Sequence, residues 1–136
     1  MRNDYPKIIG SFVHGKIDRP IGSHHPKYPD MTYPLNYGYV DDILAEDGEQ
    51  QDIYLLGSDK PLTEFGGYVI AVYRRDKDVE DKWIISLDNK NYSDPEILKQ
   101  IAFQEKFFTG KLLRWILFLN KCQKEISNIT EPIYCS

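Results

Sequence analysis

The chain has 136 residues, a length that suits one domain with a sizeable core and is short for two. Its 41% of hydrophobic, 13% of aromatic and 28% of charged residues are typical of a folded globular protein rather than a disordered one. The formal net charge of −4 argues against nucleic-acid binding, which depends on an excess of Lys and Arg, and acidic clusters favour metal cations instead.

The sequence shows neither the pattern of a membrane-spanning helix nor that of an export signal. The longest apolar run, 112–119, is interrupted by Arg114 and is far shorter than the roughly 20 residues that a bilayer requires. The polar N-terminus has no apolar signal-peptide core. We therefore expect a cytoplasmic protein with no membrane partner. Because thiols stay reduced in that compartment, Cys122 and Cys135 are interpreted as free thiols.

The first two thirds of the chain carry the pattern of strands. Short stretches rich in β-branched and aromatic residues alternate with Gly, Pro and Asp, which predicts strands joined by loops. The predicted strands cover 8–13, 38–44, 52–56, 67–74 and 83–87. No helical period separates them, so an antiparallel or mixed β-barrel is favoured over βαβ units.

The segment 19–34 differs from its surroundings. It holds four of the eight prolines together with Gly22, Ser23 and two histidines, His24 and His25. This composition is too irregular for a helix or a strand, so it predicts a long loop, either ordered or floppy. Without Cys or Glu at ligand spacing, the two histidines are interpreted as loop or interface residues rather than as zinc ligands or a general acid.

The pattern becomes helical after residue 89. Ser-Asp-Pro-Glu at 93–96 supplies N-cap candidates, an early proline and an acidic first turn, which predicts a helix over 94–108. Gly110 is expected to end it, and 111–124 can form a second amphipathic segment. Roughly the last 12 residues are expected to form a loose tail. The predicted fold class is therefore α+β, a small mixed barrel with one or two C-terminal helices in a single domain, 1–136.

Two acidic clusters are candidates for metal binding. Asp47, Glu49 and Asp52 lie within six residues, and neighbouring carboxylates repel by about 1 to 4 kcal/mol per pair, so cations would stabilise them. Oxygen ligands favour magnesium, manganese or calcium. A second cluster runs from Asp76 to Asp81, after the predicted strand 67–74. A solvated acidic turn is the alternative for the first cluster, and an exposed hairpin turn for the second.

An aromatic stretch precedes the first cluster. It reads Tyr-Pro-Leu-Asn-Tyr-Gly-Tyr over 33–39, and as a structural feature it would serve as an aromatic plug of the barrel. Followed by Asp-Gly-Glu-Gln-Gln-Asp at 47–52, it resembles the signature of the soluble, magnesium-dependent (family I) inorganic pyrophosphatases. The spacing from Tyr37 to Asp47 also agrees with that family. The resemblance covers about 17–108 and implies an OB-like barrel that hydrolyses pyrophosphate to two orthophosphates.

This resemblance implies a set of metal ligands. Asp47, Asp52 and Asp81 would hold the two Mg²⁺ ions, or Mn²⁺, that share the attacking water. Asp76 and Asp18 would bind metals that arrive with the substrate. All five are carboxylates, as hard divalent cations require.

The resemblance also implies catalytic and phosphate-binding residues. Glu49 would accept the proton of the water, although the family has Asp there, and the extra methylene shifts the carboxylate by ~1.5 Å, enough to reduce the rate by ~100-fold. Lys27, Arg19, Lys82 and the Tyr37 hydroxyl would contact phosphate oxygens. Surface salt bridges are the structural alternative for these four side chains.

The chain departs from the family pattern at several points. Only five residues separate Lys27 from Tyr33, where the family has a hairpin with a phosphate-binding arginine. Arg19 could supply the guanidinium, either as a substitute or because Asp18-Arg19 matches the Asp-Arg end of a strand in the family. Lys82 lies one residue short of the family position. The Tyr-Lys contacts of the C-terminal helix fall on Phe108 and Thr109, and are therefore missing.

These departures leave three functions open. Pyrophosphate hydrolysis is the leading hypothesis, and an enlarged pocket would suit another phosphoanhydride, such as a nucleotide. A metal- or phosphate-binding descendant without catalysis is a different class of function. An OB-like nucleic-acid binder is disfavoured because base stacking needs a basic groove around it. The sequence is also compatible with a homo-oligomer.

Overall fold

The computed structural model describes residues 5–44, 49–77, 81–88 and 90–114. Asp47, both cysteines and the predicted C-terminal tail lie outside the described residues. The elements in chain order are α1 (Tyr5–Ile8), β1 (Phe12–Arg19), β2 (Asn36–Leu44), β3 (Gln50–Leu56), β4 (Glu64–Arg75), β5 (Asp81–Ser86), α2 (Asp94–Glu105) and β6 (Gly110–Arg114). None of the helices in these ranges is long and apolar enough to cross a membrane.

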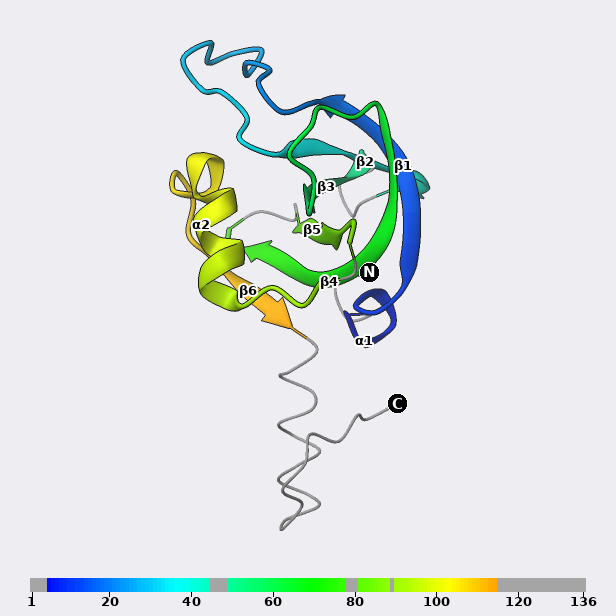
Figure 1. Cartoon of the computed structure of the whole chain (residues 1–136). Coiled ribbons are helices and arrows are strands. Elements are labelled where there is room, and N and C mark those ends of the chain that lie inside the picture. The colour runs from blue at the N-terminus through cyan, green and yellow to red at the C-terminus, as the bar shows by residue number, and fades with distance from the viewer. Residues whose placement is uncertain (1–4, 45–48, 78–80, 89, 115–136) are drawn as a thin grey trace, which may run out of the picture.

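Five strands close into a barrel, and α2 lies against one side of it (Figure 1). The order around the barrel is β1, β2, β3, β5 and β4, and β4 pairs with β1 to close it. The neighbours are antiparallel except for β3 and β5, which are parallel. The mixed barrel predicted from the sequence is therefore confirmed.

The first strand lies later in the chain than the sequence predicts. A single helical turn occupies Tyr5–Ile8, and β1 runs from Phe12 to Arg19, so the predicted strand 8–13 is wrong in its bounds. Val13, Gly15 and Ile17 alternate with exposed residues, as expected when one face of a strand is buried. In the sequence this alternation of hydrophobic and polar residues is weak, because Gly15 occupies one of the inward-facing positions.

The core has two layers, one on each face of the barrel wall. The inner cluster includes Ile53, Leu55 and Trp83, which face the barrel interior. The outer cluster includes Tyr54 and Ile84, which pack against α2. Because both faces of β3 and β5 are covered, their side chains are buried almost continuously rather than in alternation.

The described start of the second amphipathic segment, expected at 111–124, is a strand rather than a helix, and 115–124 lie outside the described residues. Residues Gly110–Arg114 form β6, which pairs antiparallel with the end of β4 from Ala71 to Arg75. The opposite end of the same edge of β4 is covered by β1. Strand β6 therefore satisfies backbone groups that would otherwise form an open edge, and this long-range pairing overrides the local helical pattern.

Helix α2 begins where the sequence predicts. Ser93 is the N-cap and forms a capping box with Glu96, which stabilises the first turn. The helix ends at Glu105 rather than at the predicted residue 108, and the chain continues in a turn that leaves 65% of Phe107 exposed. This turn carries aromatic rings that a continuing helix would have placed elsewhere.

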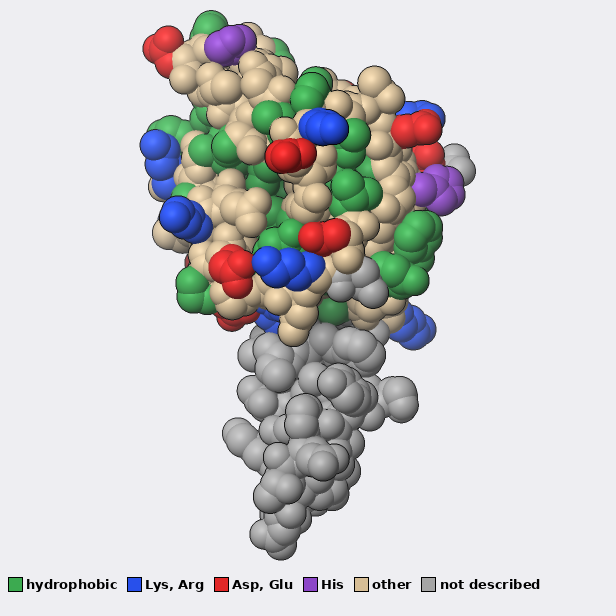
Figure 2. Space-filling model, viewed as in Figure 1, with side chains coloured by type: hydrophobic (Ala, Val, Ile, Leu, Met, Phe, Trp, Pro, Cys, Tyr) green, Lys and Arg blue, Asp and Glu red, His purple; other side chains and the backbone are tan. Residues whose placement is uncertain are grey.

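The long loop between β1 and β2 is ordered and projects from the barrel (Figures 1 and 2). Backbone hydrogen bonds join its two arms, such as Gly22 N–H to Tyr33 O at 2.9 Å and His25 N–H to Met31 O at 2.9 Å. The buried Asn36 side chain accepts a hydrogen bond from the Ile21 N–H of this loop. It also binds the segment between β3 and β4, where it accepts from the Leu62 N–H and donates to the Lys60 carbonyl. Of the two alternatives left by the sequence, the ordered loop is correct.

Gly38, in the aromatic stretch, allows β1 and β2 to approach closely. A Cβ atom at this position would overlap the carbonyl oxygen of Lys16. Gly38→Ala should therefore lower the free energy of unfolding by about 1 to 3 kcal/mol, because the two strands must separate. Urea denaturation followed by circular dichroism measures this loss.

Gly66→Ala is the matched control for this prediction. A Cβ atom at Gly66 meets the side chain of Phe12 at 3.1 Å, and this exposed ring can move away. Little loss is expected there, since alanine suits a strand better than glycine does. Equal losses in the two variants would contradict the close-approach explanation.

Candidate active site

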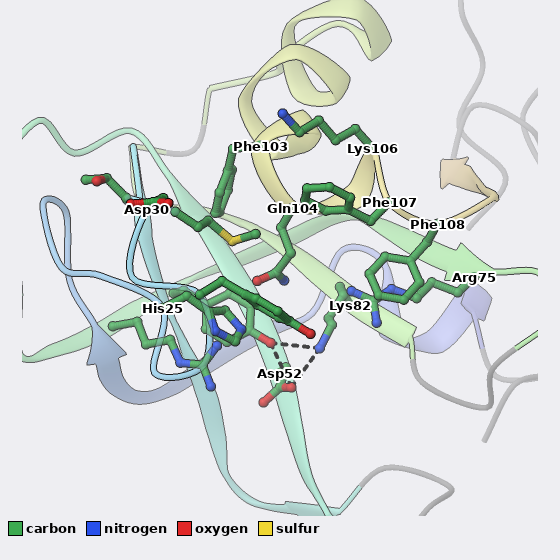
Figure 3. Close-up of a pocket in the computed structure, with 15 residues that line it drawn as sticks. His25, Asp30, Asp52, Arg75, Lys82, Phe103, Gln104, Lys106, Phe107 and Phe108 are labelled. Atoms are coloured by element: carbon green, nitrogen blue, oxygen red, sulfur yellow. Dashed lines mark hydrogen bonds and ion pairs between the residues drawn. The ribbon is translucent and has the colours of Figure 1, made fainter.

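A cavity of about 830 Å³ opens between the β1–β2 loop and the C-terminal end of α2. Its floor is made of barrel side chains, and its walls come from the loop and from the turn after α2 (Figure 3). Hydrophobic side chains are visible on the molecular surface between the projecting loop and α2 (Figure 2). The cavity therefore combines three parts of the chain that are far apart in sequence.

Tyr37, Asp52 and Lys82 form a compact cluster on the cavity floor. The Lys82 ammonium donates to the Tyr37 hydroxyl at 2.7 Å and to Asp52 Oδ2 at 2.8 Å, and the Tyr37 hydroxyl donates to the same oxygen at 2.8 Å. The Lys82 side chain is 3% exposed, whereas that of Asp52 is 31% exposed. The three predicted residues are thus brought together, and the carboxylate keeps access to the cavity.

Arg19 lies beside this cluster because of an irregularity in the barrel. The register between β1 and β2 shifts between Ile17 and Arg19, so Arg19 pairs with Tyr37. Such bulges redirect side chains. The guanidinium lies 5.3 Å from the centre of the Tyr37 ring and donates to the Tyr33 hydroxyl at 2.5 Å. Burial acts to lower the pKa of Arg19, but the contacts with Tyr33 outweigh it and raise the pKa, so the side chain stays a cation.

A chain of hydrogen bonds runs from Arg19 through the layer between the barrel and α2. Tyr33 donates to Gln104 Oε1 at 2.9 Å, Gln104 Nε2 donates to the Tyr54 hydroxyl at 2.7 Å, and Tyr54 donates to Glu105 Oε2 at 2.5 Å. Burial, followed by the charge of Glu105, raises the pKa of Tyr54 well above its ordinary value, so its proton is retained. We call this series the buried hydrogen-bond chain.

Arg75 terminates the buried hydrogen-bond chain on the opposite side of the cavity. Its guanidinium donates to both carboxylate oxygens of Glu105, at 2.9 and 2.8 Å, and lies 3.6 Å from the centre of the Phe108 ring. Both partners of the ion pair are nearly fully buried. The paired geometry satisfies the charges, as buried ion pairs require.

Asp18 lies close enough to the floor cluster to interact with its charges. Partial shielding from water raises the pKa of Asp18, Arg19 opposes this effect, and the negative charge of Asp52 adds to it. The two carboxylates therefore repel each other across the edge of the site. A cation placed between them would relieve this repulsion.

The two acidic segments enter the barrel at the same end. Strands β3 and β5 are parallel neighbours, with Ile53 opposite Trp83, so the starts of the two strands lie at the same end of the barrel. Gln51 links them, since its Nε2 donates to the Asp81 carbonyl at 2.7 Å. Asp81 itself is buried and shares its strand face with Trp83 rather than with Lys82. The segments converge, but the Asp81 side chain is not placed beside Asp52.

Among the described residues, the predicted site residues outside the cavity lining are Asp18, Asp81, Asp76, Glu49 and Lys27. Asp76 is exposed beyond the end of β4, where its backbone N–H donates to Thr109 O at 2.8 Å. Glu49 is exposed just before β3, and Lys27 is exposed in the β1–β2 loop. Among the described residues, no group of three His, Cys, Asp or Glu side chains is arranged to hold a metal ion. The ligand set predicted from the resemblance includes Asp47, which lies outside those residues.

The structure adds functional candidates that sequence reasoning missed. Arg75 and Glu105 pair across 30 positions, and Gln104 connects two tyrosines, but none of the three belongs to a local motif. His25 lines the cavity and stacks on Tyr33 at 6.3 Å, whereas His24 bonds within its own loop. The sequence signal for Gln104 and Glu105 is their position on a face of the predicted helix that also carries apolar residues.

Gln104 is the central link of the buried hydrogen-bond chain. Gln104→Leu would remove the partner of two tyrosine hydroxyls in a nearly dry layer, and should lower the free energy of unfolding by about 2 to 4 kcal/mol. Chemical denaturation measures the change. Gln100→Leu, at a partly exposed position of the same helix, should change stability by no more than about 0.5 kcal/mol. Similar losses in both variants would contradict this role.

Comparison of the sequence with curated proteins finds inorganic pyrophosphatases. The chain is 36% identical over 83 residues to the inorganic pyrophosphatase of Saccharolobus solfataricus, and 31% identical over 86 residues to that of Sulfolobus acidocaldarius. Each match covers 59% of this chain and 44% of the relative. The chain thus spans less than half the length of these two relatives. No protein-family model matches the chain.

Comparison of the structure finds the same group of proteins. The inorganic pyrophosphatase of Ehrlichia chaffeensis superposes with a TM-score of 0.61 at 13% identity, over 80% of this chain and 89% of that one. That of Helicobacter pylori gives 0.57 at 17% identity, over 88% and 92%. At these identities the likeness shows the fold. The resemblance inferred from the stretch 33–52 is confirmed: in sequence and in fold, the chain resembles a shortened family I inorganic pyrophosphatase.

Proposed function

We propose that the protein is a cytoplasmic hydrolase that cleaves inorganic pyrophosphate to two orthophosphates with the help of Mg²⁺. The observation that carries the proposal is the cluster of Tyr37, Asp52 and Lys82 on the cavity floor, with Arg19 beside it. Three of these side chains can donate hydrogen bonds to an anion, and two carry a positive charge. The similarity to curated inorganic pyrophosphatases supports the same reaction.

The cationic side chains would hold the substrate phosphates. Lys82 is buried, so its charge acts at a lower effective dielectric than a surface lysine would experience. Arg19 is fixed by Tyr33, and a guanidinium held in place can donate two parallel hydrogen bonds to phosphate oxygens. The Tyr37 hydroxyl would add a neutral donor if its proton turned from Asp52 to the substrate. Together they would stabilise negative charge on the phosphoryl oxygens as the bridging bond breaks.

Asp18 and Asp52 suit a divalent cation because they are carboxylates, the ligands that hard cations prefer, and each feels the negative charge of the other. We propose that they hold Mg²⁺ together with Asp47, and the resemblance adds Asp76 and Asp81 to this set. When bound, such ions supply a water of lowered pKa and neutralise charge on phosphate oxygens. Asp52 would keep such an ion at the cavity floor, next to Lys82.

Glu49 is the proposed acceptor of the water's proton. It lies just before β3, three residues from Asp52, and it is exposed. Its longer side chain gives it more reach than an aspartate. A general base of this kind contributes about 10² to 10⁴ in rate.

The first prediction of this proposal concerns turnover. The protein should release orthophosphate from pyrophosphate only when Mg²⁺ is present, and Asp52→Asn should abolish most of this activity. Since Asp52 is the partner of the buried Lys82, circular dichroism must show that the variant is folded. Glu49→Gln, at an exposed position, should lose about 100-fold or more in kcat without unfolding. A wild type as slow as Asp52→Asn would reject the hydrolase.

The second prediction concerns metal binding without turnover. Replacing a residue that only hydrogen-bonds to a metal ligand lowers metal affinity about 10- to 100-fold. Asp18→Asn removes a proposed ligand and should therefore weaken Mg²⁺ binding at least tenfold, as measured by calorimetry. Asp18 is exposed, and the fold should therefore tolerate the change. Asp59→Asn, an exposed aspartate away from the cavity, is the matched control and should bind Mg²⁺ like the wild type. Equal affinities in the two variants would exclude Asp18 from the site.

A further inference from the structure

The cavity has an aromatic upper part that pyrophosphate hydrolysis does not use. Tyr28 comes from the β1–β2 loop, whereas Phe103, Phe107 and Phe108 come from α2 and the turn that follows it. Figure 3 shows the rings of Phe107 and Phe108 on one wall and His25 on the other, above the floor cluster. The cavity is therefore cationic at its floor and aromatic at its walls.

Several of these rings are exposed to solvent without a ligand. Among the described residues, the exposed large hydrophobic side chains include Tyr28 at 61%, Phe107 at 65% and Phe108 at 40%, and all three line this cavity. Exposed aromatic rings that gather around one opening, rather than being scattered singly, are a feature of binding sites. Their burial by a bound group would be favourable.

The size of the cavity also exceeds what a small inorganic anion fills. Pockets of roughly 300 to 1,000 Å³ hold ligands of the size of a drug or a cofactor, and this one measures about 830 Å³. Pyrophosphate bound to Lys82 and Arg19 would occupy the floor alone. The space between the walls would remain for an organic group attached to the phosphates.

The lining indicates which organic group fits. Within the described part of the chain, Met31 is the one apolar side chain of the lining that is not aromatic, so a long aliphatic chain finds few partners. Asp30 and Thr32 add polar groups to the loop wall. Burial, followed by the charges of Arg19 and Lys27, lowers the pKa of His25, which therefore offers a neutral ring at pH 7. Flat rings with polar edges, such as nucleobases, suit this wall.

We propose that the aromatic walls bind the base of a nucleoside diphosphate whose phosphates lie on the floor at Lys82 and Arg19. This inference rests on the hydrolase proposed above and adds nucleoside diphosphates to its substrates. Water would attack the terminal phosphorus, and the bond from that phosphorus to the bridging oxygen would break. The products are orthophosphate and a nucleoside monophosphate that keeps the bridging oxygen, and the proton lost by the water passes to Glu49 and then to solvent.

Binding of two non-hydrolysable ligands tests the proposal. Calorimetry in the presence of Mg²⁺ would compare adenosine 5′-(α,β-methylene)diphosphate with methylenediphosphonate, which lacks the nucleoside. The wild type should bind the adenosine compound at least about fivefold more tightly, the lower limit expected for stacking of one base. Phe107→Ala should remove most of this preference and leave the affinity for methylenediphosphonate unchanged.

Phe12→Ala is the matched control variant. Phe12 is 58% exposed, close to the exposure of Phe107, but it packs on Tyr68 outside the cavity. It should bind both ligands like the wild type, which separates a base-binding role of Phe107 from a general effect of losing a surface ring.

The possible results separate this proposal from the function on which it rests. Pyrophosphate hydrolysis without a preference for the adenosine compound would keep the hydrolase and overturn the base site. A preference that depends on Phe107, with no orthophosphate released from pyrophosphate or ADP, would keep the nucleotide site and overturn the hydrolase. Tighter binding of geranyl diphosphate than of the adenosine compound would overturn the choice of a nucleobase.

Discussion

The buried hydrogen-bond chain is the interaction on which the cavity depends. It runs from Arg19 at the end of β1 to Arg75 at the end of β4, and its middle links belong to the β1–β2 loop, β3 and α2. Because these polar groups lie in an apolar layer, each must keep its partner or lose about 1 to 3 kcal/mol. The chain therefore fixes α2 at one position on the barrel and fixes two arginines on opposite sides of the opening.

The parallel pairing of β3 and β5 is the second constraint. Antiparallel neighbours would bring the start of one strand to the end of the other, whereas parallel neighbours bring both starts to the same end. Two segments rich in carboxylates enter the barrel there, and Gln51 ties them through the Asp81 carbonyl. Lys82 supplies a positive charge next to Asp52. This charge offsets part of the repulsion among the carboxylates at this end of the barrel.

The cavity links these constraints to function. Its floor combines the family-like cluster of Tyr37, Asp52 and Lys82 with an arginine that a bulge in β1 directs to the same face. Its walls are the long ordered β1–β2 loop and a turn with phenylalanines, Phe107 and Phe108, at the end of α2. A charged floor under aromatic walls suits a phosphate ligand that carries a ring, and this combination distinguishes the cavity from a simple anion site.

Local sequence determined the barrel class, strands β2 to β5, the capped start of α2 and the resemblance carried by 33–52, because turn residues, capping groups and short motifs act over a few positions. Only the tertiary structure decided where β1 lies, that β6 is a strand, and that Arg75, Glu105 and Gln104 join the site. Each of these depends on partners far along the chain, such as Tyr37 for Arg19 in β1 and Glu105 for Arg75. The physical reason is that open strand edges and buried charges select their partners by position in space, which no local pattern records.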